Sequence, residues 1–188
     1  SRYVLTYTIN AHGYLQTEAS YEPGADDIPL IPKFGMRLAI PKDYCNIKWY
    51  GRGPQENYID RKTGAFLGVW SMPVEDLYFP YIRPQESGYR TDTRWLVLKN
   101  GNSGLKFQAA TPFSFNAQYF EKEDFKNTPQ KELMRNIDLQ KRDYISLNID
   151  YRQMGVGGDN SWGDKPHEIY MIYPHEYEYS YWILPIVE

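Results

Sequence analysis

The sequence predicts an all-β fold built from antiparallel strands. Apolar and polar residues alternate with a period of two in several short segments, which is the pattern of strands that bury one face. Glycine, asparagine and proline, which favour turns, separate these segments, and helix signals are few. The predicted strand segments are residues 3–9, 36–40, 47–49, 95–97, 105–107, 113–115, 145–149 and 179–183.

The first and last segments show the clearest alternation, because tyrosine and aliphatic residues recur at every second position over 3–9 and 179–183. The segments at 36–40, 47–49 and 145–149 repeat aliphatic or tryptophan residues in the same way. Aromatic residues make up 16% of the chain. Such side chains fit half-buried sheet surfaces, and they also form flat faces on which sugar rings can rest.

One hairpin and one helix have specific local signals. The connection at 99–104 contains Asn100-Gly101, which supplies the positive φ angles that a tight hairpin loop needs. Residues 128–134 begin with a threonine that can cap a helix and a proline that suits its first turn. We therefore expect one short helix over 128–134.

Composition and charge limit the domain organisation and the partners. The chain has 188 residues, of which 41% are hydrophobic and 24% charged, and this balance is typical of a soluble globular protein and predicts one compact domain over residues 1–188. The net charge is −3 and basic residues are scattered, which argues against a nucleic-acid partner. No apolar run approaches the roughly 20 residues that span a bilayer, so we expect no membrane partner.

Three stretches are too irregular for strand interiors and are the places where chemistry could lie. They are rich in glycine, proline, aromatic and charged residues, and they cover residues 49–61, 81–90 and 154–162. Glu56, Asp60 and Glu86 lie in the first two. A retaining glycosidase needs two carboxyl groups about 5 Å apart, but we favour ion-paired loops, with Arg52 and Arg61 near the first two acids and Arg83 and Arg90 near the third.

Other catalytic or metal-binding patterns are weak. Cys45 is the only cysteine, so no internal disulfide can form. His167 and His175 are each followed by glutamate, but no third ligand is evident, and His12 is isolated. We therefore expect surface histidines and no metal site in this chain.

The three loop motifs carry a family resemblance. They read W-x-G-x-G-P-Q-E-N-Y-x-D-R at 49–61, P-x-E-x-G at 84–88 and M-G-x-G-G-D-x-S-W at 154–162. In order and spacing they resemble the C-terminal, fifth or small-chain domain of lacZ-type β-galactosidases of glycoside hydrolase family two. Three such motifs in sequence are far more specific than a single glycine-rich loop.

The resemblance implies an antiparallel supersandwich of the galactose mutarotase-like type, packed against a catalytic (β/α)₈ barrel of the same parent chain. That barrel would hold both catalytic glutamates of the retaining β-galactosidase, so the resemblance implies no catalytic residue in this chain. Family members usually carry roughly another hundred residues of this domain before the matching segment, so we expect a chain that begins inside its domain. Full-length members often use Mg and Na ions, and the resemblance leaves the compartment open between cytoplasm and periplasm.

The motif at 154–162 is the best candidate for contact with substrate. Its glycines favour a sharp turn, and Asp159 and Asn160 can hydrogen-bond nearby backbone to fix the loop that presents Trp162. In the resembling family this tryptophan lines the sugar pocket of the barrel. We therefore predict that Trp162 contacts a galactoside in the full-length enzyme, with Asp159 and Asn160 in supporting positions.

Three hypotheses of different classes follow. The first is an accessory domain that shapes the sugar pocket of a β-galactosidase and stabilises the parent assembly. The second is a free-standing carbohydrate-binding module, for which Tyr50, Tyr58, Tyr81 and Tyr89 would have to converge on one open face. The third is a small sugar-isomerising enzyme, which would need a histidine and a glutamate in one groove. The density of motif matches favours the first.

Overall fold

The computed structural model describes residues 1–25, 27–125, 135–160 and 162–187, and these residues form nine antiparallel strands. The strands are β1 (Arg2–Ile9), β2 (Leu15–Glu22), β3 (Lys33–Pro41), β4 (Asn46–Gly53), β5 (Phe66–Pro73), β6 (Arg90–Asn100), β7 (Ser103–Gln118), β8 (Tyr144–Gln153) and β9 (Tyr177–Val187). Short 3₁₀ helices lie at η1 (Val74–Leu77), η2 (Lys122–Phe125), η3 (Asn136–Asp138) and η4 (Glu168–Tyr170). The described part of the chain is therefore all-β, as predicted. In it, no helix has the length and apolar character needed to cross a membrane.

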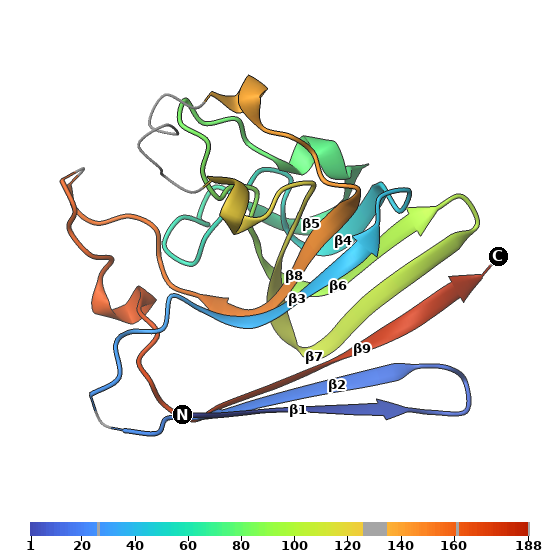
Figure 1. Cartoon of the computed structure of the whole chain (residues 1–188), viewed down its shortest axis with the longest axis horizontal. Coiled ribbons are helices and arrows are strands. Elements are labelled where there is room, and N and C mark those ends of the chain that lie inside the picture. Colours follow the sequence, from blue (N-terminus) through green and yellow to red (C-terminus); the bar gives the residue numbers. More distant parts are fainter. Residues whose placement is uncertain (26, 126–134, 161, 188) are drawn as a thin grey trace.

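The long strand β7 connects two groups of strands. The main path of the sheet is β1-β2-β9-β7-β6-β4-β5, and β8 pairs with both β7 and β3. The first part of β7, residues 103–108, pairs with β9, whereas residues 114–118 pair with β8. Figure 1 shows β1, β2 and β9 side by side below the other strands. The chain thus forms a sandwich-like antiparallel arrangement around β7.

The core lies where β4, β6, β7 and β8 turn their apolar faces toward one another. Trp49 and Phe115 are fully buried and meet edge to face with ring centroids 5.7 Å apart. Aliphatic residues complete the cluster, and truncating one of them to alanine costs about 2–5 kcal/mol in such a setting. The buried core members are Ile40, Ile47, Trp49, Val74, Leu77, Leu96, Leu98, Phe107, Phe113, Phe115, Ala117, Ile145, Leu147, Ile149 and Tyr181.

Strand β8 and the second half of β7 are polar on the face that points away from this core. Side chains alternate between the two faces of a strand. On β8 the apolar face carries Ile145, Leu147 and Ile149, whereas the other face carries Ser146, Asn148 and Asp150. The register places Asp150 opposite Ser114, Asn148 opposite Asn116 and Ser146 opposite Gln118. These six side chains form a continuous polar surface on β7 and β8, which we call the polar floor.

All eight predicted strand segments fall inside strands, and the hairpin between β6 and β7 is confirmed with Gly101 at φ 55°. The segments at 105–107 and 113–115 are parts of the single strand β7. Strand β2 escaped prediction because its inward positions include Thr17 and Ala19, which give little hydrophobic signal. Strand β5 escaped because apolar residues occupy both of its faces. The helix predicted over 128–134 lies outside the described residues.

Candidate functional site

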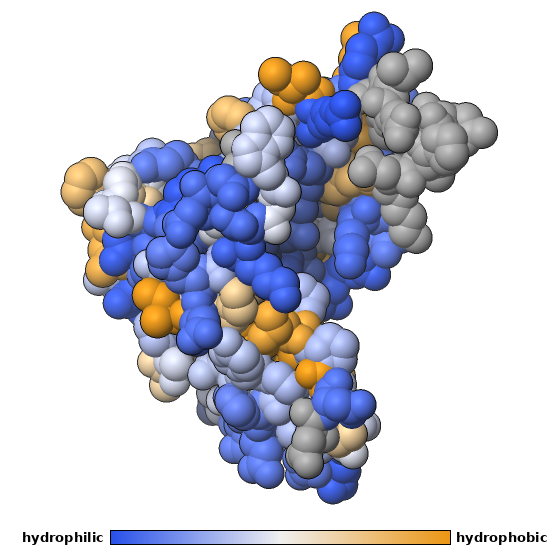
Figure 2. All heavy atoms as spheres, turned by 90° about the vertical axis from the view of Figure 1, so that its left-hand side faces the viewer, coloured by the Kyte–Doolittle hydropathy of each residue, from blue (hydrophilic) through white to orange (hydrophobic). Residues whose placement is uncertain are grey.

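The glycine-rich loop leaves the end of β8 and is fixed by backbone contacts at its start. Met154 donates its N–H to Pro32 at 3.0 Å, and Gly155 donates to Tyr170 at 2.8 Å. In Figure 1 the loop extends to the left of the sandwich, and Figure 2 shows that this side is largely hydrophilic with small hydrophobic areas. The loop therefore has an anchored base and an exposed tip.

Trp162 lies at that tip and is 91% exposed. Its backbone N–H donates to Asn160 Oδ1 at 2.8 Å, which is the local side-chain to backbone bond that the sequence predicts. Asp159 Oδ1 lies 2.7 Å from His167 Nε2, and both side chains are exposed. The structure thus brings the three predicted site residues together on one loop and excludes a buried core position for the indole.

Asp60 joins the first loop motif to the glycine-rich loop. Its Oδ2 accepts the backbone N–H groups of Val156 at 2.8 Å and Gly157 at 2.9 Å. A Cβ atom at Gly155 would lie 2.7 Å from the same oxygen, so glycine at this position allows the carboxylate to reach the backbone. Asp60 is therefore a positioning residue for the loop that carries Trp162.

Glu56 joins the first motif to the second. One of its oxygens pairs with Arg61 Nη2 at 2.6 Å and accepts the Tyr81 hydroxyl, while the other accepts the N–H of Gly88 at 2.7 Å. The predicted ion pair between Glu56 and Arg61 is confirmed. These contacts give the carboxylate a structural role in which two loops are held together.

The other predicted ion pairs are wrong in their partners. Asp60 binds backbone amides, and Arg52 pairs with Asp92 at 2.5 Å. Glu86 pairs with Lys33 at 2.6 Å, because β3 passes beside its loop. Arg90 donates to backbone carbonyls, including that of Gly88 at 2.7 Å. Spacing along the chain could not reveal Asp92 as the partner of Arg52 or Lys33 as the partner of Glu86, because each pair joins distant segments.

The tyrosines proposed for an open sugar-binding face do not form one. Tyr58 and Tyr89 are 3% and 1% exposed, and their rings stack on each other at 5.4 Å. Burial of these rings stabilises the loops of the first and second motifs. The hypothesis that Tyr58 and Tyr89 contribute to an exposed platform is therefore wrong.

A pocket of about 390 Å³ lies over the polar floor of β7 and β8, and sequence reasoning missed it. Lys33 and Gly35 of β3, Glu86 of the second motif and 154–156 of the glycine-rich loop also line it. The available signal was the polar residues at every second position of the two strands. This pattern is also that of a sheet face exposed to solvent, and the sequence does not show that other segments cover it.

The floor of this pocket is buried although it is polar. Asn116 and Asp150 are 3% and 1% exposed. Asn116 Nδ2 donates to the carbonyl of Ser87 at 2.7 Å, and Gln118 donates to the same oxygen. Asn116 Oδ1 and Gln153 Oε1 are buried and have no hydrogen-bond partner among the described residues. Such atoms are costly to bury unless a water molecule or a ligand satisfies them.

Lys33 and Asp150 provide the electrostatic character of the pocket. Lys33 Nζ lies 2.6 Å from Glu86 Oε1 and 3.5 Å from Asp150 Oδ2. Burial raises the pKa of the Asp150 carboxyl to about 7, against the opposing attraction of Lys33. Burial also lowers the pKa of the Lys33 ammonium, but Asp150 and Glu86 together outweigh this effect and keep it above its usual value. The lysine is therefore charged at neutral pH.

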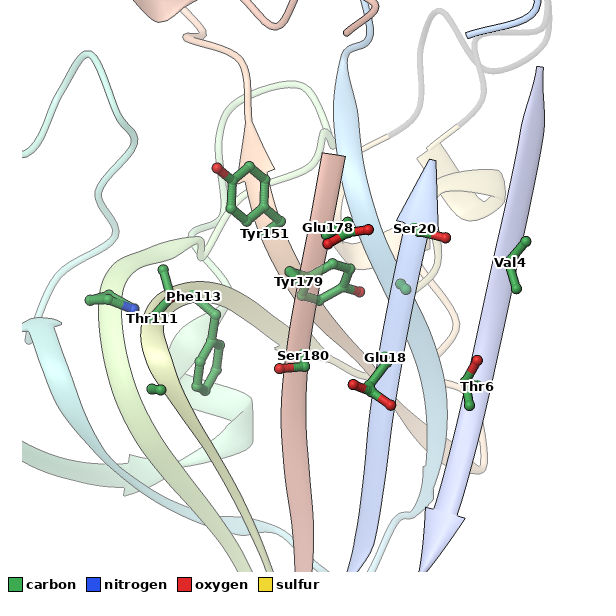
Figure 3. A pocket seen from close by; sticks show the side chains of 13 residues that line it. Val4, Thr6, Glu18, Ser20, Thr111, Phe113, Tyr151, Glu178, Tyr179 and Ser180 are labelled. Carbon is green, nitrogen blue, oxygen red and sulfur yellow. The ribbon is translucent and has the colours of Figure 1, made fainter. Parts of the chain in front are cut away.

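A second hollow, of about 430 Å³, lies beside β1, β2 and β9 (Figure 3). Figure 3 shows Glu18 and Ser20 of β2 and Glu178 and Ser180 of β9 around it, with Tyr151 on the far side. No buried side-chain atom without a hydrogen-bond partner belongs to its lining residues in the described chain. Its polar groups can be satisfied by solvent, so it gives no specific sign of a ligand.

The histidines lie outside both hollows. His12, His167 and His175 are all exposed, as expected for surface histidines. The described ranges contain no group of three or more His, Cys, Asp or Glu side chains arranged to hold a metal ion. Within these residues, the notable features are the exposed indole and the buried polar pocket.

The described fold and loops define an all-β sandwich whose distinctive residues gather on connected loops at one side. Comparison with protein families gives the particular family. The family described as beta galactosidase small chain matches residues 1–183, and the chain belongs to it.

The chain matches only a small part of the length of its curated relatives. β-Galactosidases of Priestia megaterium and Streptococcus thermophilus are 36% and 34% identical over 90% and 97% of this chain. The β-galactosidase of Lactobacillus delbrueckii subsp. bulgaricus is 37% identical over 87% of it. These matches cover 16%, 17% and 16% of the respective relatives. The chain therefore spans about one sixth of the length of the curated relatives that it matches.

Proposed function

We propose that the chain is an accessory domain of a β-galactosidase and that it presents Trp162 to the sugar bound by the parent enzyme. The single observation that carries this proposal is the exposed indole on an anchored loop. Trp162 is 91% exposed, while Asp60 holds the loop through two backbone amides. A large aromatic side chain without internal packing contributes little to folding, and tryptophan is enriched among residues that contact binding partners, so a role in contact with another molecule is favoured.

The indole suits a galactoside because sugars have apolar C–H faces that stack on aromatic rings. Asn160 fixes the backbone at Trp162, and Asp159 pairs with His167 near the exposed tip of the same loop. In this proposal Trp162 binds the galactoside, and Asn160 and Asp159 orient the loop that carries the indole. They offer no pair of free carboxyl groups for acid–base chemistry.

The catalytic acids of the parent reaction are proposed to lie in its barrel domain. A retaining mechanism requires one carboxyl group as acid and another as nucleophile. In this chain Glu56 is held by Arg61, Tyr81 and Gly88, and Glu86 is held by Lys33. Both are committed to loop structure. Partner and substrate are thus the catalytic domain of the same parent chain and a terminal β-galactoside.

The first test is Trp162→Ala in the full-length β-galactosidase. Loss of one stacking contact of about 0.5–1.5 kcal/mol predicts a KM for a chromogenic β-galactoside that rises up to about tenfold. Trp162→Tyr should retain part of the affinity. Ile169→Ala is the matched control, because Ile169 is also exposed nearby, at 71%. Unchanged KM and kcat in Trp162→Ala would contradict the proposal.

The second test uses the chain alone with the same chromogenic substrate. We expect hydrolysis at the rate of the buffer blank. Hydrolysis that is lost in Glu56→Gln or Glu86→Gln would show that catalytic acids lie in this chain and would overturn the accessory role. Circular dichroism of each variant checks that the fold is retained.

A further inference from the structure

The polar pocket over β7 and β8 has the charge balance of a site for a neutral ligand. Its lining contains three basic and three acidic side chains. Within it, the ammonium of Lys33 already lies between Glu86 and Asp150. A bound cation would compete with this lysine, and a bound anion would meet the carboxylates. The charged lining residues are Lys33, Arg37, Lys122, Glu86, Glu121 and Asp150.

The unpartnered atoms of the pocket show what a ligand must supply. Asn116 Oδ1 and Gln153 Oε1 are both hydrogen-bond acceptors, and Asp150 Oδ2 has no hydrogen bond although Lys33 lies 3.5 Å away. A ligand that fits must therefore offer several donors. Hydroxyl groups meet this need, and because each can also accept, they suit the Lys33 ammonium as well.

The side chains of the floor are held in place before any ligand binds. A Cβ atom at position 35 would lie 2.0 Å from Asp150 Oδ1, so the carboxylate occupies space that only glycine leaves free. The Ser87 carbonyl holds Asn116, and Glu86 holds Lys33. Preorganised polar groups of this kind lose little freedom when a ligand binds.

The pocket also has apolar surface. Phe120 and Met154 belong to its lining. A volume of about 390 Å³ falls within the range of small-molecule sites. A lining that combines polar acceptors with apolar side chains suits a ring that has hydroxyl groups at its edge and C–H groups on its face.

We propose that this pocket binds a neutral monosaccharide, at a site separate from the Trp162 indole. The inference goes beyond the accessory role, because it gives the chain a sugar site of its own. The two sites are neighbours, since Met154 to Val156 line the pocket and begin the loop that carries Trp162. A ligand in the pocket would therefore contact the base of that loop directly.

The test is a titration of the full chain with D-galactose and D-glucose. Binding is monitored by calorimetry and by the NMR signals of the side-chain amides. We expect saturable binding that shifts the amide signals of Asn116 and Gln153. Gln153→Leu removes an unpartnered acceptor and should weaken binding by about tenfold or more. Gln108→Leu is the matched control, because Gln108 is an exposed glutamine of β7 outside the pocket.

Two further variants separate this site from the proposed function. Asp150→Asn keeps the shape of the side chain and should also weaken binding, with thermal unfolding as the check on its fold. Trp162→Ala should leave the dissociation constant of the isolated chain within about twofold. Its effect on KM in the full-length enzyme tests the accessory role independently.

Three results would overturn the inference. Binding that is lost in Trp162→Ala but retained in Gln153→Leu would place the sugar on the loop. Stabilisation by NaCl or MgCl₂ without any response to either sugar would identify a cation site. Unchanged amide signals up to the highest soluble sugar concentration would show that water alone satisfies the pocket.

Discussion

The polar pocket and the glycine-rich loop lie next to each other, yet they hold their polar residues in opposite ways. In the pocket, Asp150 is 1% exposed and its neighbours are fixed by hydrogen bonds. In the loop, Asp159 and Trp162 are exposed, and order comes from anchors at the base. A substitution in the pocket must therefore change stability, whereas a substitution at the loop tip can change binding alone.

The largest expected effect is that of Gly35→Ala. Because the new Cβ would lie 2.0 Å from Asp150 Oδ1, the carboxylate or strand β3 must move. Overpacking of this kind costs about 1–3 kcal/mol in the free energy of unfolding, measured by urea denaturation. Gly64→Ala is the control, because no atom lies within 4 Å of its added Cβ. Equal stabilities for the two variants would show that the pocket tolerates an added side chain as well as the open surface does.

Asp60→Ala should have the next largest effect, and it acts at the junction of the two regions. It leaves the N–H groups of Val156 and Gly157 without their acceptor, so the base of the loop opens more often. Hydrogen exchange at these two amides should accelerate by about ten- to a hundredfold, since a lost hydrogen bond to a charged group is worth about 1.5–3 kcal/mol. Asp159→Ala, at the exposed tip, should leave both rates unchanged. Acceleration in both variants would mean that the tip, and not Asp60, fixes the base.

The pH dependence of stability gives an effect with a defined sign. Burial raises the pKa of Asp150 to about 7 from 3.8, so the folded protein keeps this proton over a range in which the unfolded chain has lost it. The contribution of Asp150 to stability should therefore fall as pH rises from about 4 to about 7, and then level off. Urea denaturation of the wild type and of Asp150→Asn across this range isolates the group. We expect the free energy of unfolding of the wild type minus that of Asp150→Asn to fall as pH rises. A value that stays constant or rises would show that folding does not raise the pKa of Asp150.

The smallest effect on stability is expected for Trp162→Ala. Because its side chain is 91% exposed, the free energy of unfolding should change by less than about 0.5 kcal/mol. Thermal unfolding of the isolated chain measures this. A loss of several kcal/mol would show that the indole packs against the protein in solution and would remove the contrast between the two regions.

The same contrast explains what the sequence could and could not predict. Strands with one apolar face, such as β1 and β8, and the turn at Gly101 have local signals, so they were predicted. The loop of Trp162 was recognisable because its glycines and aromatic residue are adjacent in the sequence. The pocket was not, because its burial depends on Lys33 and Glu86, which are 53 positions apart, and on the covering loop at Ser87.

The close approach of Gly35 and Asp150 also has an evolutionary consequence. The two residues are direct partners in the β3–β8 register, and the carboxylate fills the space that a Cβ atom would need. Neither position can drift freely, because a side chain at 35 is tolerated only when the partner at 150 is shorter or turned away. Across relatives, the two positions should therefore be inherited as a pair, and natural sequences with another residue at 35 should also have lost the aspartate.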